Sequence, residues 1–214
     1  MKKTAKAARC DGVGRMKLTK NLTLASQSEI RAAILRGAGL AFNVCVSGVD
    51  EAALKAAHQG TAESLAGALA TAKARAVFDD GQNEGLIIGA DQILECDGVL
   101  YDKPRNMDEA RRNLLRFRGK GHYLVGAVVL LENGQQVWSH CGRVALTMRD
   151  FSEPFLDAYL AQAGEAVLSS VGCYQLEGLG AHLFADIDGD YFSILGLPLL
   201  PLLDGLRAHG GLLA

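Results

Sequence analysis

Short apolar runs alternate with segments of helical pattern through the first half of the chain. The run LTLA at 22–25 leads through Ser26-Gln27-Ser28 into the helix-like stretch at 29–39. A second run at 42–46 precedes an Ala-rich segment from Thr61 to Phe78, which we expect to form a long helix. Alternating strands and helices are typical of the α/β class.

The third apolar run, Gly85–Ala90, contains no polar residue, as expected for a strand that is buried on both faces. We expect this strand to end at Asp91. The segment Cys96-Asp97-Gly98 then turns the chain back.

The second half of the chain contains caps and one strong hairpin signal. Asn106 and Glu109 have the spacing of a capping box for a helix that reaches about Phe117, and Ser152 can cap a helix over 153–163. Apolar stretches at 122–131 and 136–147 flank Asn133-Gly134, and this pair favours a tight hairpin turn. The sequence therefore predicts an α/β fold with a mixed, twisted sheet flanked by helices.

Composition limits the classes of protein to consider. With 214 residues, 49% of them apolar, the chain can bury the core of one domain or of two closely packed lobes. Neither a secretory signal nor a membrane-spanning stretch is recognisable, so we expect a cytoplasmic protein that does not bind membranes. The five cysteines form no CxxC or CxxH pair, and we interpret them as reduced core thiols, not zinc ligands.

Charge is distributed unevenly along the chain. Residues 1–20 carry seven Lys or Arg and one acid, which leaves 15 basic and 23 acidic residues for 21–214. We expect residues 1–20 to be a flexible basic extension or the product of an upstream start codon, with Met16 as the alternative start, and 21–214 to form a single domain. An acidic body repels nucleic acid, so no nucleic-acid partner is expected unless the extension provides the affinity.

Ser26-Gln27-Ser28 is the first candidate site. A turn from a strand into a helix presents backbone N–H groups and the positive end of the helix dipole, and both attract phosphate. Arg31, one turn later, can add a bidentate contact to phosphate oxygens. The simpler alternative is that a serine caps the helix and Arg31 is a solvated side chain.

Two carboxylates and two lysines complete a set of groups suited to phosphoryl chemistry. Asp91 and Glu51 each follow a strand-like run and can ligate Mg²⁺ together with substrate phosphates. The alternatives are that Asp91 equally well shapes a turn and that Glu51, taken alone, is more often a surface acid. Lys73 and Lys103 can stabilise charge on a polyphosphate, although isolated lysines usually face solvent. Core or surface roles suit His122, His140 and His182, because no spacing among them makes a catalytic triad.

Residues 22–206 resemble the Maf family of nucleotide pyrophosphatases, which is named for a link to septum formation. The family opens with S-x-S-P-R-R, which Ser26 to Arg31 match in part. The other matching segments follow in family order: Asp50-Glu51, Lys73-Ala74, Gly89-Ala90-Asp91, Lys103-Pro104, Gly119-Lys120-Gly121-His122, Gly172-Cys173-Tyr174, Glu177-Gly178, Gly189-Asp190-Tyr191 and Gly196-Leu197-Pro198-Leu199.

The resemblance implies a fold similar to inosine-triphosphate pyrophosphatases, with two lobes around a cleft, and a house-cleaning activity that splits a nucleoside triphosphate between its α- and β-phosphates. It also implies a divalent metal, Mg²⁺ or Mn²⁺, and, by analogy with members that are often dimers, a homodimer. By the same resemblance, Asp91 is the general base or a metal-associated carboxylate and Glu51 is a metal ligand. The implied triphosphate contacts are Ser26, Ser28, Arg31, Lys73 and Lys103, and the two lysines join Asp91 in the catalytic set.

Departures from the common pattern point to one branch of the family. Glu29-Ile30 replaces Pro-Arg, Gln92 follows the catalytic Asp where Thr is frequent, and Glu177 stands where Gln is common. Ile30, Gln92 and Glu177 together resemble the branch that acts on 7-methyl-GTP. A carboxylate can accept hydrogen bonds from the N1–H and exocyclic amine of guanine and favours its cationic, methylated ring.

Three alternatives stay open at this point. A pyrimidine preference, for dTTP or UTP, is the alternative within the family. The second is a nucleotide-binding regulator of cell division that has lost turnover, because Ser169-Ser170 occupies the place of a frequent Asp-Lys pair. A nucleic-acid binder that works through residues 1–20 is the third.

Overall fold

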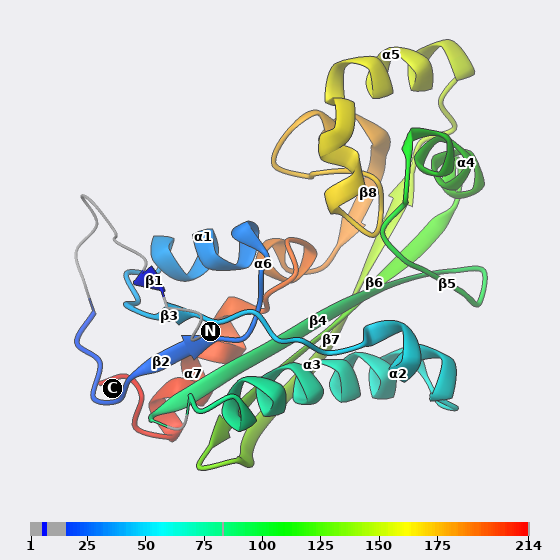
Figure 1. Cartoon of the computed structure of the whole chain (residues 1–214). Coiled ribbons are helices and arrows are strands. Elements are labelled where there is room, and N and C mark those ends of the chain that lie inside the picture. Colours follow the sequence, from blue (N-terminus) through cyan, green and yellow to red (C-terminus); the bar gives the residue numbers. More distant parts are fainter. Residues whose placement is uncertain (1–5, 8–15, 83, 214) are drawn as a thin grey trace. The chain divides into compact units, whose positions relative to one another are not determined.

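A computed structural model describes residues 6–7, 16–82 and 84–213 of the chain (Figure 1). The chain divides into two compact units. The first consists of the described parts of 1–91, 126–142 and 196–214, and the second of 92–125 and 143–195. Among the described helices, none is both long enough and apolar enough to cross a membrane.

Parallel strands form the centre of the first unit. β2 (Leu22–Leu24) lies between β3 (Asn43–Val44) and β4 (Leu86–Cys96), and both neighbours run parallel to it. A short strand, β1 (Lys6–Ala7), pairs antiparallel with β3. Leu22 and Leu24 of β2 and Leu86 and Ile88 of β4 are buried, as expected for strands covered on both faces.

Helices cover both faces of these parallel strands. α1 (Glu29–Gly37) connects β2 to β3, and α2 (Glu51–Ala57) and α3 (Ala62–Asp79) connect β3 to β4. The two connections cross the sheet in opposite directions, and parallel connections are right-handed. For that reason α1 and α3 lie on opposite faces of the strands (Figure 1).

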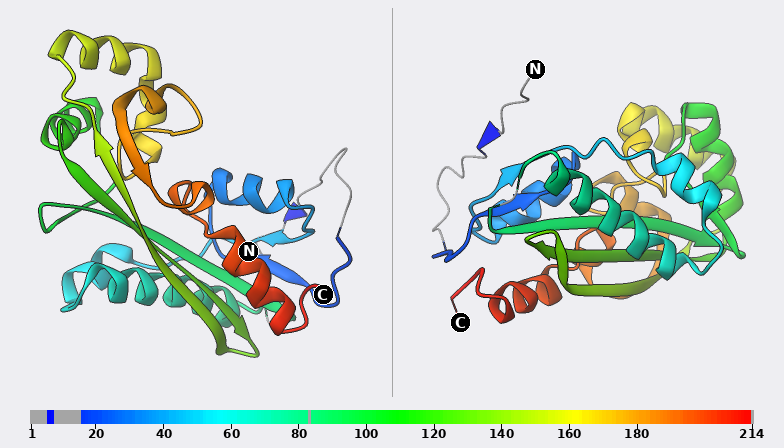
Figure 2. Two further views of the ribbon diagram at one scale, coloured as in Figure 1. Left: turned by 180° about the vertical axis from the view of Figure 1, so that it is seen from behind. Right: turned by 60° about the horizontal axis from the view of Figure 1, so that its bottom comes forward.

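The hairpin predicted at Asn133-Gly134 is confirmed. β6 (Gly121–Glu132) and β7 (Gln135–Met148) flank the turn, and Asn133 and Gly134 have φ angles of 49° and 74°, as a type I′ turn requires. In the first unit, β7 packs against α7 (Leu199–Ala208), the red helix of Figure 2.

The described strands form one sheet in the order β1-β3-β2-β4-β6-β7-β8. β5 (Val99–Tyr101) pairs antiparallel with residues 94–96 of β4, and β8 (Phe184–Asp188) pairs antiparallel with β7. Parallel and antiparallel pairs in one helix-flanked sheet confirm the predicted mixed α/β class. The expected cleft stays a prediction.

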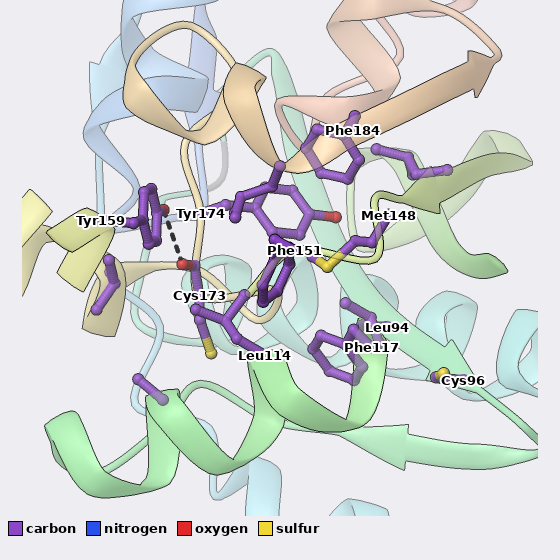
Figure 3. Close-up of a cluster of buried hydrophobic side chains, with 14 of the residues drawn as sticks. Leu94, Cys96, Leu114, Phe117, Met148, Phe151, Tyr159, Cys173, Tyr174 and Phe184 are labelled. Atoms are coloured by element: carbon purple, nitrogen blue, oxygen red, sulfur yellow. Dashed lines mark hydrogen bonds between the residues drawn. The ribbon is translucent and has the colours of Figure 1, made fainter. Parts of the chain in front are cut away.

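The second unit contains a separate hydrophobic core (Figure 3). Phe117, Leu114, Cys173, Tyr174 and Phe184 are among its buried members. The helices that contribute to this unit are α4 (Met107–Phe117), α5 (Glu153–Ala163) and α6 (Tyr191–Ile194), with two 3₁₀ segments at Gly164–Ser169 and Leu179–Leu183.

The predicted helix starts agree with the structure. Thr61, Asn106 and Ser152 cap α3, α4 and α5, and each side-chain oxygen accepts a hydrogen bond from the backbone N–H three residues later. The predicted end of a strand at Asp91 is wrong, because β4 continues to Cys96. The continuation has a physical cause: residues 94–96 gain a new partner, β5, after the Asp97-Gly98 turn.

The prediction of core thiols holds for only part of the cysteines. Cys96 and Cys173 are buried free thiols, whereas Cys45 is half-buried and Cys141 is exposed. Cys10 lies outside the described residues.

Most of the basic extension expected at 1–20 also lies outside the described residues. Of the described part, Met16 donates its backbone N–H to the carbonyl of Gly39, and Leu18 forms an isolated β-bridge with Leu212.

Candidate active site

The strand order of the first unit reverses between β2 and β4. The chain leaves β2 toward β3 on one side, while β4 pairs with β2 on the other side. In open α/β sheets, ligands bind where the order of parallel strands reverses, at the carboxyl ends of the strands. Leu24 pairs with Ile88, so Ser26 and Asp91 both lie just beyond the paired part of these two strands.

Gly89 allows α3 to approach β4 closely. A Cβ atom at Gly89 would lie 2.2 Å from the carbonyl oxygen of Ala70 and 2.9 Å from the Cβ of Ala74, both on α3. Because side chains alternate along a strand, Asp91 projects from the same face of β4 as Gly89. The close approach therefore brings α3 within reach of the Asp91 carboxylate.

Lys73 of α3 makes that contact and links Asp91 to Glu51. Its Nζ lies 2.6 Å from Asp91 Oδ1 and 2.8 Å from Glu51 Oε1. Lys73 is 8% exposed and Asp91 is 5% exposed, so this is a largely buried ion pair. Glu51 is the first residue of α2, and the preceding Asp50 caps that helix by accepting from the N–H of Ala53. All three charged residues were predicted from the sequence as site residues, but their contact was not.

Arg31 is the second cation of the site. Its Nε donates to the carbonyl of Gly196 at 2.8 Å, and its Nη1 donates to the carbonyl of Ala90 at 2.9 Å and to Ser26 Oγ at 3.4 Å. Burial lowers the pKa of Arg31, while the charges of Asp91 and Glu51 raise it. The alternative that Arg31 is a solvated side chain is therefore wrong. Nothing in the sequence signals the two carbonyl acceptors, since they are backbone atoms.

The two serines organise the first turn of α1. Ser28 Oγ accepts the N–H of Arg31 and so caps the helix, as the simpler alternative proposed. Ser26 Oγ accepts the N–H of Ser28 at 3.2 Å and is 7% exposed. Both oxygens accept backbone hydrogen bonds here, and each hydroxyl retains a proton that it can donate to an anion. Ile30, which also lies in the first turn of α1, is half-buried.

Gln92, Lys103 and Glu177 belong to the second unit. Gln92 Nε2 donates to the carbonyls of Ser193 and Ile194 at 2.8 and 3.2 Å. Lys103 and Glu177 are exposed. Of the residues selected from the sequence, the structure thus brings together Ser26, Ser28, Arg31, Glu51, Lys73 and Asp91 within the first unit.

The donor set of the site suits a divalent metal that is completed by a substrate. Glu51 and Asp91 offer hard carboxylate oxygens that already converge on one cation, the Lys73 ammonium. Mg²⁺ is commonly held by one or two carboxylates together with substrate phosphates. Within the described residues, no group of three or more His, Cys, Asp or Glu side chains is arranged to enclose a metal, so an all-protein cage is not indicated there.

Fold and site together define an α/β protein in which two cations and two carboxylates meet around a buried Lys73–Asp91 pair at the switch point of its parallel strands. The chain belongs to the Maf-like protein family, whose model matches residues 21–209.

Relatives match the chain over nearly their full length. It is 52% identical over 193 residues to a nucleoside triphosphate pyrophosphatase of Paramagnetospirillum magneticum, which covers 88% of this chain and 98% of the relative. A nucleoside triphosphate pyrophosphatase of Caulobacter vibrioides is 50% identical over 89% of this chain and 96% of its own. A 7-methyl-GTP pyrophosphatase of Brucella suis is 45% identical with the same two coverages.

Proposed function

We propose that the protein hydrolyses nucleoside triphosphates to the monophosphate and pyrophosphate, and that 7-methyl-GTP is its preferred substrate. The observation that carries the proposal is the contact of Lys73 with both Asp91 and Glu51 beside the serine turn of α1. Family membership and relatives about half identical to this chain place it among hydrolases of the phosphoanhydride bond.

Asp91 is the proposed catalytic carboxylate. An ionised carboxylate can accept a proton from the attacking water or orient it toward phosphorus. Its position supports this role, since Lys73 fixes one carboxylate oxygen at 2.6 Å and the Arg31 guanidinium binds the preceding carbonyl of Ala90. A carboxylate that is held from two sides loses little freedom when it meets the substrate.

Charge balance supports a divalent metal as cofactor. Arg31 and Lys73 together balance Glu51 and Asp91, so these four side chains add no net positive charge for a polyphosphate. Mg²⁺ or Mn²⁺, held by Glu51 and Asp91, would supply that charge and act as a Lewis acid toward the phosphate oxygens. The protein's own part is to present both carboxylates in a fixed geometry.

The proposed phosphate contacts come from the first turn of α1. The hydroxyls of Ser26 and Ser28 can donate to phosphate oxygens, and α1 directs its free N–H groups and positive dipole end to the same place. Arg31 adds positive charge there. Lys103 is proposed as a further contact that stabilises the departing pyrophosphate, on the resemblance of Lys103-Pro104 to the family motif.

Base preference is proposed from Glu177, Ile30 and Gln92. The Glu177 carboxylate can pair with the N1–H and exocyclic amine of guanine, and its charge favours the methylated cationic ring. The apolar Ile30 does not repel that cation as an arginine would. A relative that is 45% identical and named 7-methyl-GTP pyrophosphatase supports the same preference.

A substrate panel tests the proposal. Pyrophosphate release is measured with 7-methyl-GTP, GTP, dTTP, UTP and CTP in the presence of Mg²⁺ or Mn²⁺. We expect the highest kcat/KM with 7-methyl-GTP and no release when EDTA removes the metal. Preference for dTTP or UTP would contradict the roles of Glu177 and Gln92, and triphosphate binding without pyrophosphate release would indicate the regulator.

A further inference from the structure

His122 and Tyr174 lie in two segments that match the family pattern, but neither residue has a role in the proposed function. The two side chains meet inside the second unit, where His122 Nε2 lies 2.8 Å from the hydroxyl oxygen of Tyr174. His122 is 1% exposed and Tyr174 is 4% exposed, so the hydrogen bond is shielded from water.

The surroundings of this pair are aromatic. The His122 ring stacks on Phe117 with centroids 5.5 Å apart, and Tyr174 packs edge-on against Phe184 at 4.8 Å. His122 Nδ1 is buried with no hydrogen-bond partner among the described residues. An unpaired buried nitrogen destabilises a fold relative to an apolar ring of similar shape. An apolar ring could not form the hydrogen bond to Tyr174, and this bond is the contact that accounts for an imidazole at this position.

Tyr174 begins the loop that carries Glu177. The residue before it, Cys173, has a φ of 60°, and its carbonyl accepts a hydrogen bond from the Tyr159 hydroxyl at 3.1 Å (Figure 3). The Cys173 carbonyl and the Tyr174 hydroxyl thus fix the start of the loop at two adjacent residues.

The rest of the loop is tightly folded on itself. The N–H of Gly178 donates to the carbonyl of Gln175 at 3.2 Å, and a Cβ at Gly180 would lie 2.4 Å from the same carbonyl oxygen. A shift at Tyr174 is therefore transmitted to Glu177, because the short turn between them leaves little room for compensation.

We propose that His122 and Tyr174 are positioning residues for base recognition: their hydrogen bond holds the loop at 174–180 in the conformation in which Glu177 meets the nucleobase. The inference rests on the proposed function, since it assumes that Glu177 reads the base. A residue held in its binding conformation loses less entropy when ligand binds, so the effect is on substrate affinity and selectivity.

Tyr174→Phe removes the hydroxyl and keeps the ring. We measure the selectivity ratio, which is kcat/KM for 7-methyl-GTP divided by kcat/KM for ribose 5-triphosphate, a substrate that has no base. A net hydrogen-bond contribution of about 1.4 kcal/mol corresponds to a loss of about tenfold in this ratio. We expect this loss to come from a higher KM for 7-methyl-GTP, with kcat changed less than twofold. Tyr101→Phe is the matched control, because Tyr101 packs on Phe117 in the same aromatic cluster.

Two substitutions of His122 separate hydrogen bonding from packing. The amide nitrogen of Gln can occupy the position of His Nε2, whereas that of Asn occupies the position of Nδ1 and does not reach Tyr174. We expect His122→Gln to keep the selectivity ratio within about threefold of the wild type and His122→Asn to lose it as Tyr174→Phe does. Selectivity ratios that are equal in His122→Gln, His122→Asn and the Tyr101→Phe control would overturn the proposal.

Hydrogen exchange of the ligand-free protein separates failure of this inference from failure of the proposed function. We expect the amides of Gly178 and Ala181, which donate to the loop carbonyls of Gln175 and Gly178, to exchange about tenfold faster in Tyr174→Phe than in the wild type. Faster exchange in a protein that hydrolyses no triphosphate would refute the pyrophosphatase and retain the positioning role. Unchanged exchange, with unchanged selectivity, would refute the positioning role alone.

Discussion

Lys73 and Asp91 are the residue pair on which the proposed chemistry depends. The 2.6 Å contact joins a helix and a strand 18 positions apart in the sequence and is almost fully buried. A buried ion pair is weak support for stability, because desolvation offsets most of the attraction between the charges. Its presence at the strand switch point, with Glu51 on the same ammonium, is better explained by a role in binding a charged ligand.

His122 gives the clearest residue-scale prediction for pH dependence. Burial lowers the pKa of His122 to about 4 from its ordinary 6.5. Between these values the unfolded state binds a proton that the folded state does not, so the free energy of unfolding rises with pH from about 4 to about 6.5. We expect the free energy of unfolding to be about 3 kcal/mol higher above pH 6.5 than below pH 4 because of this one group.

Urea unfolding at several pH values measures this contribution. His122→Gln should remove most of the slope below pH 6.5, whereas His182→Gln, at an exposed position, should leave it in place. An unchanged slope in His122→Gln would show that other groups cause the acid sensitivity.

At the scale of secondary-structure elements, the packing of α3 on β4 sets the geometry of the centre. Gly89→Ala places a Cβ 2.2 Å from a backbone oxygen of α3, so either the helix or the strand must move. Overpacking of this kind destabilises by about 2 kcal/mol. We expect this loss in urea unfolding, together with a lower kcat as Lys73 shifts from Asp91.

Gly126→Ala on β6 is the matched control for Gly89→Ala. The nearest atom to its new Cβ is a backbone oxygen 4.0 Å away, which is ordinary contact. Because alanine restricts the unfolded chain more than glycine does, we expect no loss of stability and a gain of at most about 1 kcal/mol. Similar losses in both variants would show that the close approach at Gly89 is not special.

Element types were readable from the sequence where local chemistry decides them. Caps at Asn106 and Ser152 and the Asn133-Gly134 turn predicted two helices and a hairpin, because each uses side-chain or φ preferences of single residues. The Ala-rich pattern from Thr61 to Phe78 predicted a third helix. The continuation of β4 beyond Asp91 was missed, because it depends on pairing with β5. That partner contributes only three residues, and periodicity alone does not detect such a strand.

At the scale of the whole molecule, the sequence identified the charged groups of the site but not their contacts. Asp91, Glu51 and Lys73 were selected by residue type and position, yet a contact between distant segments follows from the register and crossover of the parallel strands. The backbone carbonyls that hold Arg31, at Ala90 and Gly196, have no sequence signal at all. Neither does the partner of His122, since no local pattern links residues 52 positions apart.

Family membership supports hydrolysis of nucleoside triphosphates, and we propose that the bond cleaved lies between the α- and β-phosphates, with Asp91 acting on the water. Phosphorus NMR of 7-methyl-GTP incubated with protein and Mg²⁺ identifies the products and so tests this proposal. We expect signals of 7-methyl-GMP and pyrophosphate, formed by the wild type and at least 100-fold more slowly by Asp91→Asn, as expected for loss of general base catalysis worth roughly 10²–10⁴-fold. Orthophosphate and 7-methyl-GDP as products, or an Asp91→Asn variant as active as the wild type, would contradict it.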